Sequence, residues 1–343
     1  MKQNIPRLVA LGLLLIVTLL IPAQSIGQRQ SRLASCRDMG FSTEEDFFTR
    51  GPTPADGNPL ISDGDLLSPT GTVCARNYDL VHDYFDVDQD MGLDAVDVIR
   101  VEQELVAFST ELDSPHGNFT AGDLLTNQGA AVPNQALLYA FGQHSDMGLD
   151  GLHFIGQTDN IVRFLSVARQ QGRAFWLQHP EAFPGYLQEY GIDLWFSIEG
   201  TIDRPGATMI LDGDVLSAAT GTVVFGNGDW LASPIPAGLP NRGVDFGLDA
   251  VGADCRGKRD TARFSTEILY RDKDSALTFT DGTVLDYGGH TVQTNWDLIA
   301  SFEPANRMMG LDALTLPSLR DRCEPLGESD YLPMIMRLFP GEQ

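Results

Sequence analysis

Short apolar runs bounded by glycine, aspartate and proline follow one another along the chain. Two of them are "LDAVDVI", which begins at Leu93, and "LVAFSTEL", which begins at Leu105. Their length and their β-branched and aromatic residues predict β-strands. Segments of the types "GDLLS" at Gly64 and "GTVV" at Gly221 predict two further strands joined by a glycine turn.

The same blocks return four times in the same order, so the chain contains an internal repeat. An "FS" block begins at Phe41, Phe108, Phe196 and Phe264. A "GD" block begins at Asp63, Ala121, Asp212 and Asp281. A looser asparagine block begins at Asn77, Asn134, Asn227 and Asn295. A "GLD" block begins at Met91, Met147, Phe246 and Met309. The β domain, 36–323, is thus divided into repeats at about 41–99, 108–155, 196–253 and 264–316.

Each repeat predicts four strands, and the phase of the repeats predicts how the chain closes. The chain enters the pattern with an FS block and leaves it with a lone "GLDAL" at Gly310. That last strand would complete the sheet of the first repeat. We therefore predict an all-β fold in which four sheets form a closed four-bladed β-propeller-like ring. Two tandem β-sandwiches of two repeats each are the alternative.

The spacing between the second and third repeats is longer than the others and locates an insertion at 156–191. Its apolar residues Ile161, Phe164, Leu165 and Val167 partly follow a helical face. We expect one or two short helices on the side of the repeat body. In the sandwich alternative, this segment would instead link the two domains.

The "DA" dipeptide at Asp94, the repeat number and the closure resemble four-bladed hemopexin-like propellers. The aromatic strand pattern of that family is absent, so the resemblance does not imply haem binding. The FS, GD and GLDA blocks also resemble uncharacterised repeat proteins exported by bacteria, for which no chemistry is implied.

The N-terminal residues 1–25 have the three regions of a secretory signal peptide: a basic start, the apolar run Leu8–Ile21 and a small-residue cleavage site at Ala23–Ser25. A lipoprotein signal is the alternative, because "LASC" at Leu33–Cys36 has the residues of a lipobox. We expect a secreted or cell-surface protein with no membrane span after signal removal, and a C-terminal tail at 324–343.

The four cysteines of the exported chain, Cys36, Cys74, Cys255 and Cys323, predict two disulfides. Ring closure would pair Cys36 with Cys323 and Cys74 with Cys255. Local pairing would join Cys36 to Cys74 and Cys255 to Cys323. Both pairings are open at this stage.

A formal net charge of −24 argues against nucleic acid as a partner. The composition is that of a globular protein, and the expected partner is an unknown extracellular protein or glycan. Four tryptophans could stack on sugars, although core packing is their commoner use. They are Trp176, Trp195, Trp230 and Trp296.

One acidic stretch has the ligand spacing of a calcium loop, and structural calcium is the only cofactor that the sequence suggests. Its candidate ligands are Asp86, Asp88, Asp90, Asp94 and Asp97. The stretch departs from the EF-hand pattern at Met91, where a glycine is required. An acidic surface turn is the alternative.

Eight acids, Asp94 again among them, recur in all four repeats, which favours a role that each repeat needs. They are Asp94, Asp150, Asp249, Asp312, Glu44, Glu111, Glu199 and Glu267. The aspartates could accept backbone hydrogen bonds within each turn. Alternatively, the four aspartates could converge near a pseudo-fourfold axis and bind a cation.

Motifs of catalysis are absent from the sequence, which contains neither HExxH nor GxSxG. We therefore expect a non-catalytic binding or surface-structural protein. The alternative is a secreted hydrolase acting on a polysaccharide or another extracellular polymer, since a carboxylate pair for glycoside hydrolysis is available.

Overall fold

The structure is a computed structural model that describes residues 31–84, 89–204, 208–230, 245–271 and 278–321. The predicted signal peptide and the C-terminal tail lie outside these residues. So do Asp86 and Asp88 of the predicted calcium loop, and Cys323.

Most strands of the described chain belong to four antiparallel sheets of four strands each. The first contains β20 (Leu314–Thr315), β1 (Gly40–Phe41), β4 (Leu66–Ser68) and β5 (Thr72–Ala75) in that order. The second contains β6 (Val96–Arg100), β7 (Leu105–Phe108), β8 (Leu124–Thr126) and β9 (Ala131–Val132). The third contains β10 (Leu152–Ile155), β11 (Asp193–Phe196), β12 (Val215–Ser217) and β13 (Thr222–Phe225). The fourth contains β14 (Ala250–Gly252), β15 (Arg263–Ser265), β18 (Val284–Asp286) and β19 (Thr291–Gln293).

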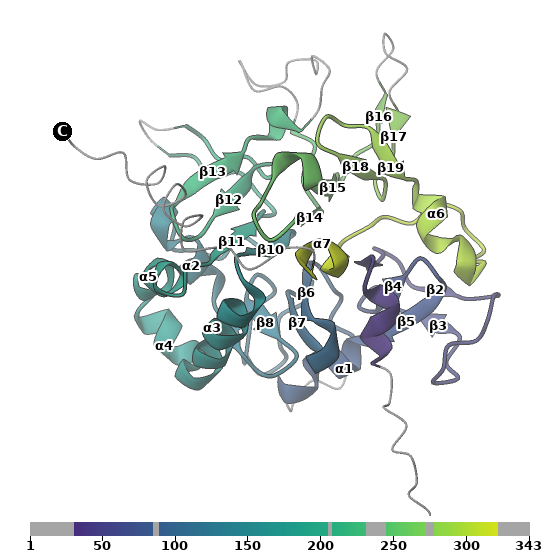
Figure 1. The fold of residues 1–343 in the computed structure, drawn as a ribbon, viewed down its shortest axis with the longest axis horizontal. Coiled ribbons are helices and arrows are strands. Elements are labelled where there is room, and N and C mark those ends of the chain that lie inside the picture. The colour runs from purple at the N-terminus through teal and green to yellow at the C-terminus, as the bar shows by residue number, and fades with distance from the viewer. Residues whose placement is uncertain (1–30, 85–88, 205–207, 231–244, 272–277, 322–343) are drawn as a thin grey trace, which may run out of the picture. The chain divides into compact units, whose positions relative to one another are not determined.

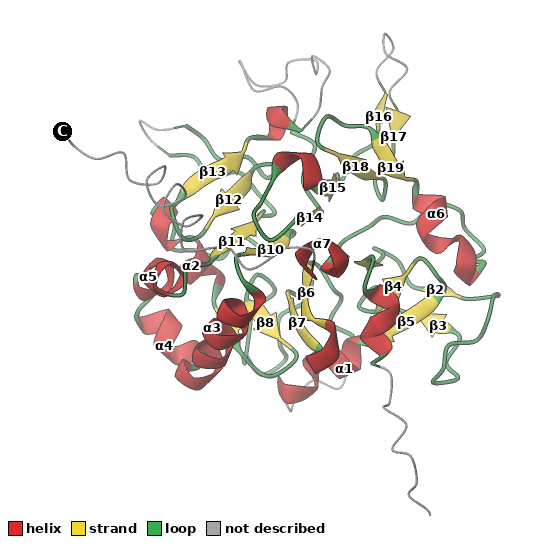
Figure 2. Cartoon of the chain, in the orientation of Figure 1, coloured by secondary structure: helices red, strands yellow, loops and turns green. Residues whose placement is uncertain are grey.

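Two small hairpins complete the strands of the described residues. Strand β2 (Phe47–Phe48) pairs with β3 (Leu60–Ile61), and β16 (Tyr270–Arg271) pairs with β17 (Thr278–Phe279). The prediction of an all-β chain built from small antiparallel sheets is confirmed (Figure 2). In every four-stranded sheet the strand of the GLD block is followed by those of the FS and GD blocks.

The first sheet is assembled from segments far apart in the sequence. Gly40 pairs with Thr315 and Phe41 with Leu314, so the last GLD block supplies a strand to the sheet of the first repeat. The four strands of the GLD blocks also contact one another. Strand β6 contacts β10 and β20, and β14 contacts the same two strands.

The repeated asparagines connect two turns within each repeat. They begin α1 (Asn77–Val81), α2 (Asn134–Leu137) and α6 (Asn295–Ile299), and the 3-10 helix Asn227–Asp229 in the third repeat. The side-chain oxygen of Asn77 accepts a hydrogen bond from the Met91 amide at 3.0 Å, and its Nδ2 donates to the Gly92 carbonyl at 3.0 Å. The asparagine thereby fixes the GLD turn to the start of the helix.

The insertion forms three helices instead of the expected one or two (Figure 1). They are α3 (Thr158–Gln171), α4 (Arg173–Gln178) and α5 (Ala182–Glu189). Phe164, Trp176 and Phe183 are fully buried, and the Phe183 ring packs edge-on against the other two at 5.8 and 5.7 Å. These rings share one core cluster with Phe154 and Leu194 of the third sheet. The helices are therefore part of the hydrophobic core.

Three of the four tryptophans are core residues. Trp176, Trp195 and Trp230 are buried, and Trp296 packs against Arg307, whose guanidinium carbon lies 5.1 Å from the ring centre. The preference for core packing over sugar stacking is thus confirmed for the first three.

One disulfide lies within the described residues and joins Cys36, at the end of the 3-10 helix Arg32–Cys36, to Cys74 on β5. The ring-closing pairing, which required Cys36 to bond Cys323, is therefore wrong. The 3-10 helix that contains Cys36 contacts β5, so the two half-cystines reach each other without any help from ring closure. Cys255 is also disulfide-bonded.

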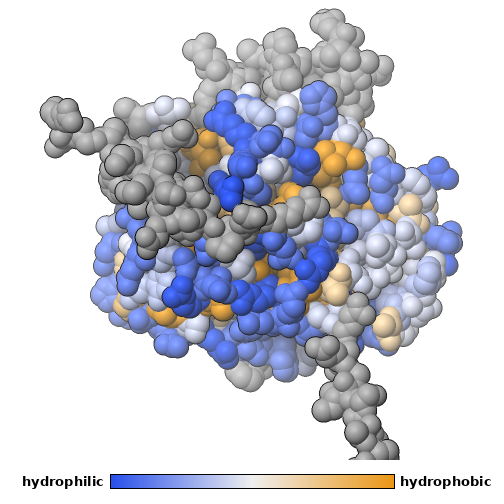
Figure 3. All heavy atoms as spheres, in the orientation of Figure 1, coloured by the Kyte–Doolittle hydropathy of each residue, from blue (hydrophilic) through white to orange (hydrophobic). Residues whose placement is uncertain are grey.

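No helix within the described residues is long and apolar enough to cross a membrane. On the face drawn in Figure 3, hydrophilic residues cover most of the described surface, and hydrophobic residues show between them. The final helix, α7 (Pro317–Asp321), follows β20 directly and contacts β6.

Candidate functional site

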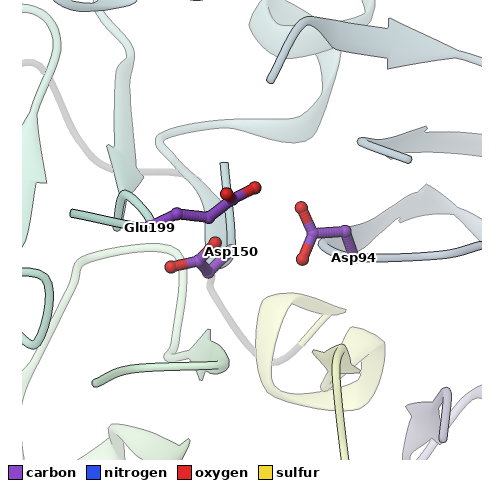
Figure 4. A group of neighbouring side chains, drawn as sticks. All are labelled: Asp94, Asp150 and Glu199. Carbon is purple, nitrogen blue, oxygen red and sulfur yellow. The ribbon is translucent and has the colours of Figure 1, made fainter. Parts of the chain in front are cut away.

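The GLD blocks bring acidic side chains from different sheets together. One carboxylate oxygen from each of Asp94, Asp150 and Glu199 lies within 4.8 Å of the other two (Figure 4). Asp94 and Asp150 lie just before β6 and β10, which belong to different sheets, and Glu199 follows β11. Oxygens around one calcium ion, each about 2.4 Å from the metal, have similar separations.

The electrostatic cluster extends to the aspartates of the other two repeats. Burial, followed by the repulsion of neighbouring carboxylates, raises the pKa of Asp94, Asp150 and Asp249 well above the ordinary value. Burial and the carboxylates of Glu111, Asp94, Glu44 and Asp249 raise the pKa of Asp312 to about 10. Each aspartate therefore lies in the field of acids from the other repeats. We call Asp94, Asp150, Asp249 and Asp312 the central aspartates.

The repeated glutamates form the exposed part of the same cluster. Burial is the first cause that raises the pKa of Glu111, Glu199 and Glu267, and it raises that of Glu44 to about 7. Glu111 and Asp312 are electrostatic neighbours. Neighbouring buried carboxyl groups repel each other unless one holds a proton or a cation neutralises them.

The glycine of each GLD block explains how the glutamates reach the aspartates. Gly92, Gly148 and Gly247 have φ of +70°, +74° and +64°, a left-handed conformation that favours glycine. A Cβ atom on any of them would collide with the glutamate side chain of the following FS block. Gly310 meets Glu44 in the same way. The glutamate therefore folds over a turn that only glycine leaves open.

In three of the FS blocks the serine links one sheet to the next. The hydroxyl groups of Ser42, Ser109 and Ser197 donate to the carbonyl oxygens of the leucine in the next GLD block, at 2.8, 2.7 and 3.0 Å. The acceptors are Leu93, Leu149 and Leu248. This bond holds the residue just before Asp94, Asp150 and Asp249.

The central aspartates are not satisfied by hydrogen bonds in their turns. In all four, Oδ2 is buried and has no hydrogen-bond partner among the described residues. Water cannot easily replace the missing partner, because Asp150 and Asp249 are only 5% and 7% exposed. The aspartates of the GD blocks behave differently. Asp65, for example, accepts hydrogen bonds from the amides of Ser62 and Asn77 at 3.1 Å. Buried carboxylate oxygens without partners are costly and need a compensating group.

A hard divalent cation fits this arrangement. Calcium binds six to eight oxygen ligands and takes carboxylates readily. Asp94, Asp150 and Glu199 offer three carboxylates at ligand separations, and Asp249 and Asp312 lie in the same electrostatic cluster. The cluster contains neither a nucleophile with an adjacent base nor a thiol, so its geometry suits cation binding better than covalent catalysis.

The structure distributes the predicted calcium-loop residues over different surroundings. Asp86 and Asp88 lie outside the described residues. Asp90 is exposed and accepts a hydrogen bond from the Gly92 amide at 3.1 Å, Asp94 belongs to the central aspartates, and Asp97 lies in a separate ion pair. Calcium binding by this loop stays a prediction.

That ion pair belongs to a buried polar cluster which the sequence did not indicate. The Asp97 carboxylate contacts the Arg320 guanidinium from α7, lies 3.4 Å from His153 Nδ1, and accepts a hydrogen bond from the Phe154 amide at 2.7 Å. Burial opposes ionisation, but Arg320 and His153 together hold the pKa of Asp97 at about 2. The one sign of this cluster in the sequence is that Asp97 and His153 occupy equivalent positions in the first and second repeats.

Comparison with known protein families, with curated proteins and with solved structures finds no match for this chain. The resemblances to exported bacterial repeat proteins and to hemopexin-like propellers therefore stay predictions. Inferences about function depend on the geometry of the residues themselves.

Proposed function

We propose that the protein is an exported, non-catalytic repeat protein whose four sheets close into a four-bladed ring around a structural calcium ion. The observation that carries this proposal is the set of four buried Oδ2 atoms without partners, one from each central aspartate. Such a ring would present its loops to an extracellular protein or glycan on a rigid frame.

The ring is supported by the contacts of the strands in the GLD blocks. Each of β6, β10, β14 and β20 contacts two of the others, in a cyclic order. Two separate sandwiches would have no reason to place β20 against β6 and to pair it with β1. The serine bonds from one sheet to the next agree with the same cyclic order.

Export is supported by the N-terminal sequence and is compatible with the disulfide. A bond between Cys36 and Cys74 persists in an oxidising compartment. Extracellular fluids also commonly supply calcium at concentrations that suit sites of moderate affinity.

A non-catalytic role is supported by the symmetry of the acids. A catalytic pair is needed once, in two different environments. Here the aspartates recur in four equivalent positions and all experience the same two influences, burial and neighbouring carboxylates. A cation centre uses such equivalence directly, because each carboxylate then has the same task.

Calcium titration of the purified, exported chain tests the proposal. Isothermal calorimetry should detect calcium binding, and the melting temperature should rise with free calcium, because a ligand of the folded state stabilises it by about 2.7 kcal/mol at a hundred times Kd. Asp150→Asn with Asp249→Asn should abolish both effects. The matched control is Glu189→Gln with Asp260→Asn, which removes equal charge at exposed residues outside the cluster.

Two outcomes would contradict the central site. Absence of calcium binding by the wild type would remove the proposal altogether. If substitution of Asp86, Asp88 and Asp90 by asparagine abolished binding while the Asp150 and Asp249 variant retained it, the loop would be the calcium site instead.

A further inference from the structure

The first sheet differs from the other three in how its two inner strands are connected. In the other sheets, the strand of the GLD block and the strand of the FS block follow each other along the chain. Strands β20 and β1 come from opposite ends of the repeat region, and only two residue pairs join them. Strands β10 and β11 are joined by four pairs. Pairing β20 with β1 closes a loop of almost the whole repeat region, so few hydrogen bonds have to offset a large loss of chain entropy.

The serine bond between neighbouring sheets is also missing next to this pair. Ser42, Ser109 and Ser197 each donate to a leucine carbonyl just before the first strand of the next sheet. The corresponding acceptor for Ser265 would be Leu311, but the Ser265 hydroxyl is buried and has no hydrogen-bond partner. The segment that leads into β20 thus lacks the connection that its three counterparts have.

The two ends of β20 are held in different ways. At its C-terminal end, Thr315 Oγ1 accepts a hydrogen bond from the Val98 amide at 2.9 Å, and α7 supplies Arg320 to the buried Asp97. In the segment that precedes its N-terminal end, the Gly310 carbonyl accepts a hydrogen bond from the Glu44 amide at 3.3 Å, and the Gly310 amide donates to the Glu45 carboxylate at 3.2 Å. That end is therefore fastened to acidic residues beside Asp312.

We propose that the central calcium ion latches this seam, by which we mean the β1–β20 pair and the residues Gly310–Ala313 that precede β20. The inference rests on the proposed calcium site. Without the ion, the carboxyl groups of the central aspartates and of Glu44 repel one another wherever they ionise, so they must either hold protons or move apart. Withdrawal of Gly310–Ala313 relieves that repulsion where the adjoining strand is paired least: β20 joins β1 by two residue pairs, whereas the strand after Asp150 joins β11 by four. With the ion, Asp312 is bound to the aspartates of the other repeats and the seam is closed.

Hydrogen exchange followed by mass spectrometry on the full exported chain, with disulfides intact, tests the latch. Peptides that cover Gly40–Phe41 and Ala313–Leu316 should exchange about tenfold faster or more in EDTA than in saturating calcium, as in local opening. Peptides from β10 and β11 should change much less. Calorimetry on the same sample shows whether calcium binds.

A matched pair of variants separates the latch from general stabilisation. Asp312→Asn and Asp150→Asn each remove one charge from the same cluster. In saturating calcium, the seam of the Asp150 variant should still be protected relative to EDTA, since Asp312 still binds the ion. The Asp312 variant should lose this calcium dependence at the seam.

The outcomes distinguish the latch from the site on which it rests. If calcium binds but protects all four sheets equally, or protects the seam no more in Asp150→Asn than in Asp312→Asn, the latch is overturned and the site stands. If calcium does not bind, both fall. The latch is supported if calcium binds, if it slows exchange mainly at the seam, and if Asp312→Asn loses this protection while Asp150→Asn keeps it.

Discussion

Replacement of Arg320 by methionine should lower the free energy of unfolding by about 3–5 kcal/mol, the usual cost of breaking a buried ion pair. The side chains of Arg320 and Asp97 are 1% and 3% exposed. Methionine retains much of the apolar packing but leaves the carboxylate with the Phe154 amide and His153 as its remaining partners. The free energy lost is therefore the cost of leaving the buried Asp97 carboxylate without its arginine counterion.

Urea denaturation at pH 7 with disulfides intact measures this loss. The control is Arg163→Met, because Arg163 is exposed on α3 and a surface arginine should contribute less than about 1 kcal/mol. Arg320→Met combined with Asp97→Asn should cost less than Arg320→Met alone, since no charge is then left without a partner. Equal costs for Arg320→Met and Arg163→Met, or a double variant that costs the sum of the single ones, would refute the reasoning.

The same pair predicts how stability depends on acid. The pKa of Asp97 is lowered from 3.8 to about 2 in the folded protein, so its contribution is fully present above about pH 4. It is lost as the pH falls through 2, and the shift corresponds to roughly 2 kcal/mol. The stability difference between the wild type and Asp97→Asn should therefore shrink by about that amount between pH 5 and pH 2. A constant difference would show that Asp97 has an ordinary pKa.

Three further predictions concern the disulfide, the insertion and the GLD turn. Alanine in place of Cys36 and Cys74 should lower the free energy of unfolding by about 4 kcal/mol in urea, because the bond spans 38 residues, and an unchanged value would contradict the bond. Phe164→Ala should cost about 3–5 kcal/mol, and a loss below about 1 kcal/mol would place the insertion outside the core. Gly148→Ala should cost at least about 1 kcal/mol, because φ is +74° and the new methyl meets Glu199. Gly185→Ala, where nothing lies within 4 Å, should be neutral or slightly stabilising, and equal effects in the two thermal melts would disprove the steric argument.

The strand order could be predicted because a repeated sequence has to form a repeated structure. The FS, GD and GLD blocks each give one strand in all four sheets, and the unpaired GLD block at Gly310 indicated that β20 would join β1. The asparagine block had no interpretation from the sequence. Its role as a bridge from helix start to GLD turn depends on two backbone segments whose approach only the fold reveals.

The partners of Asp97 could not be predicted, because they come from segments that are distant in the sequence. Arg320 lies 223 residues from Asp97 and occurs once, on a helix that no repeat contains. The alternating acids around Asp90 and Asp94 instead suggested that Asp97 belonged to a calcium loop. Ligand spacing within a loop carries no information about a helix that returns from the far end of the chain.

A recurring acid can have two physical meanings, and the GD and GLD blocks contain one of each. The GD aspartate recurs in three repeats, with Thr283 in the fourth, whereas the GLD aspartate recurs in all four. The GD aspartate is used within its own repeat: Asp65 and Asp123 accept backbone hydrogen bonds from residues of the same repeat. The GLD aspartate has no such partner for Oδ2 in any repeat. A residue whose local partners are absent four times over must be compensated where the repeats meet. Among the described residues, the groups that meet there are other carboxylates, so the compensation has to come from protons or from a cation such as the calcium ion proposed above.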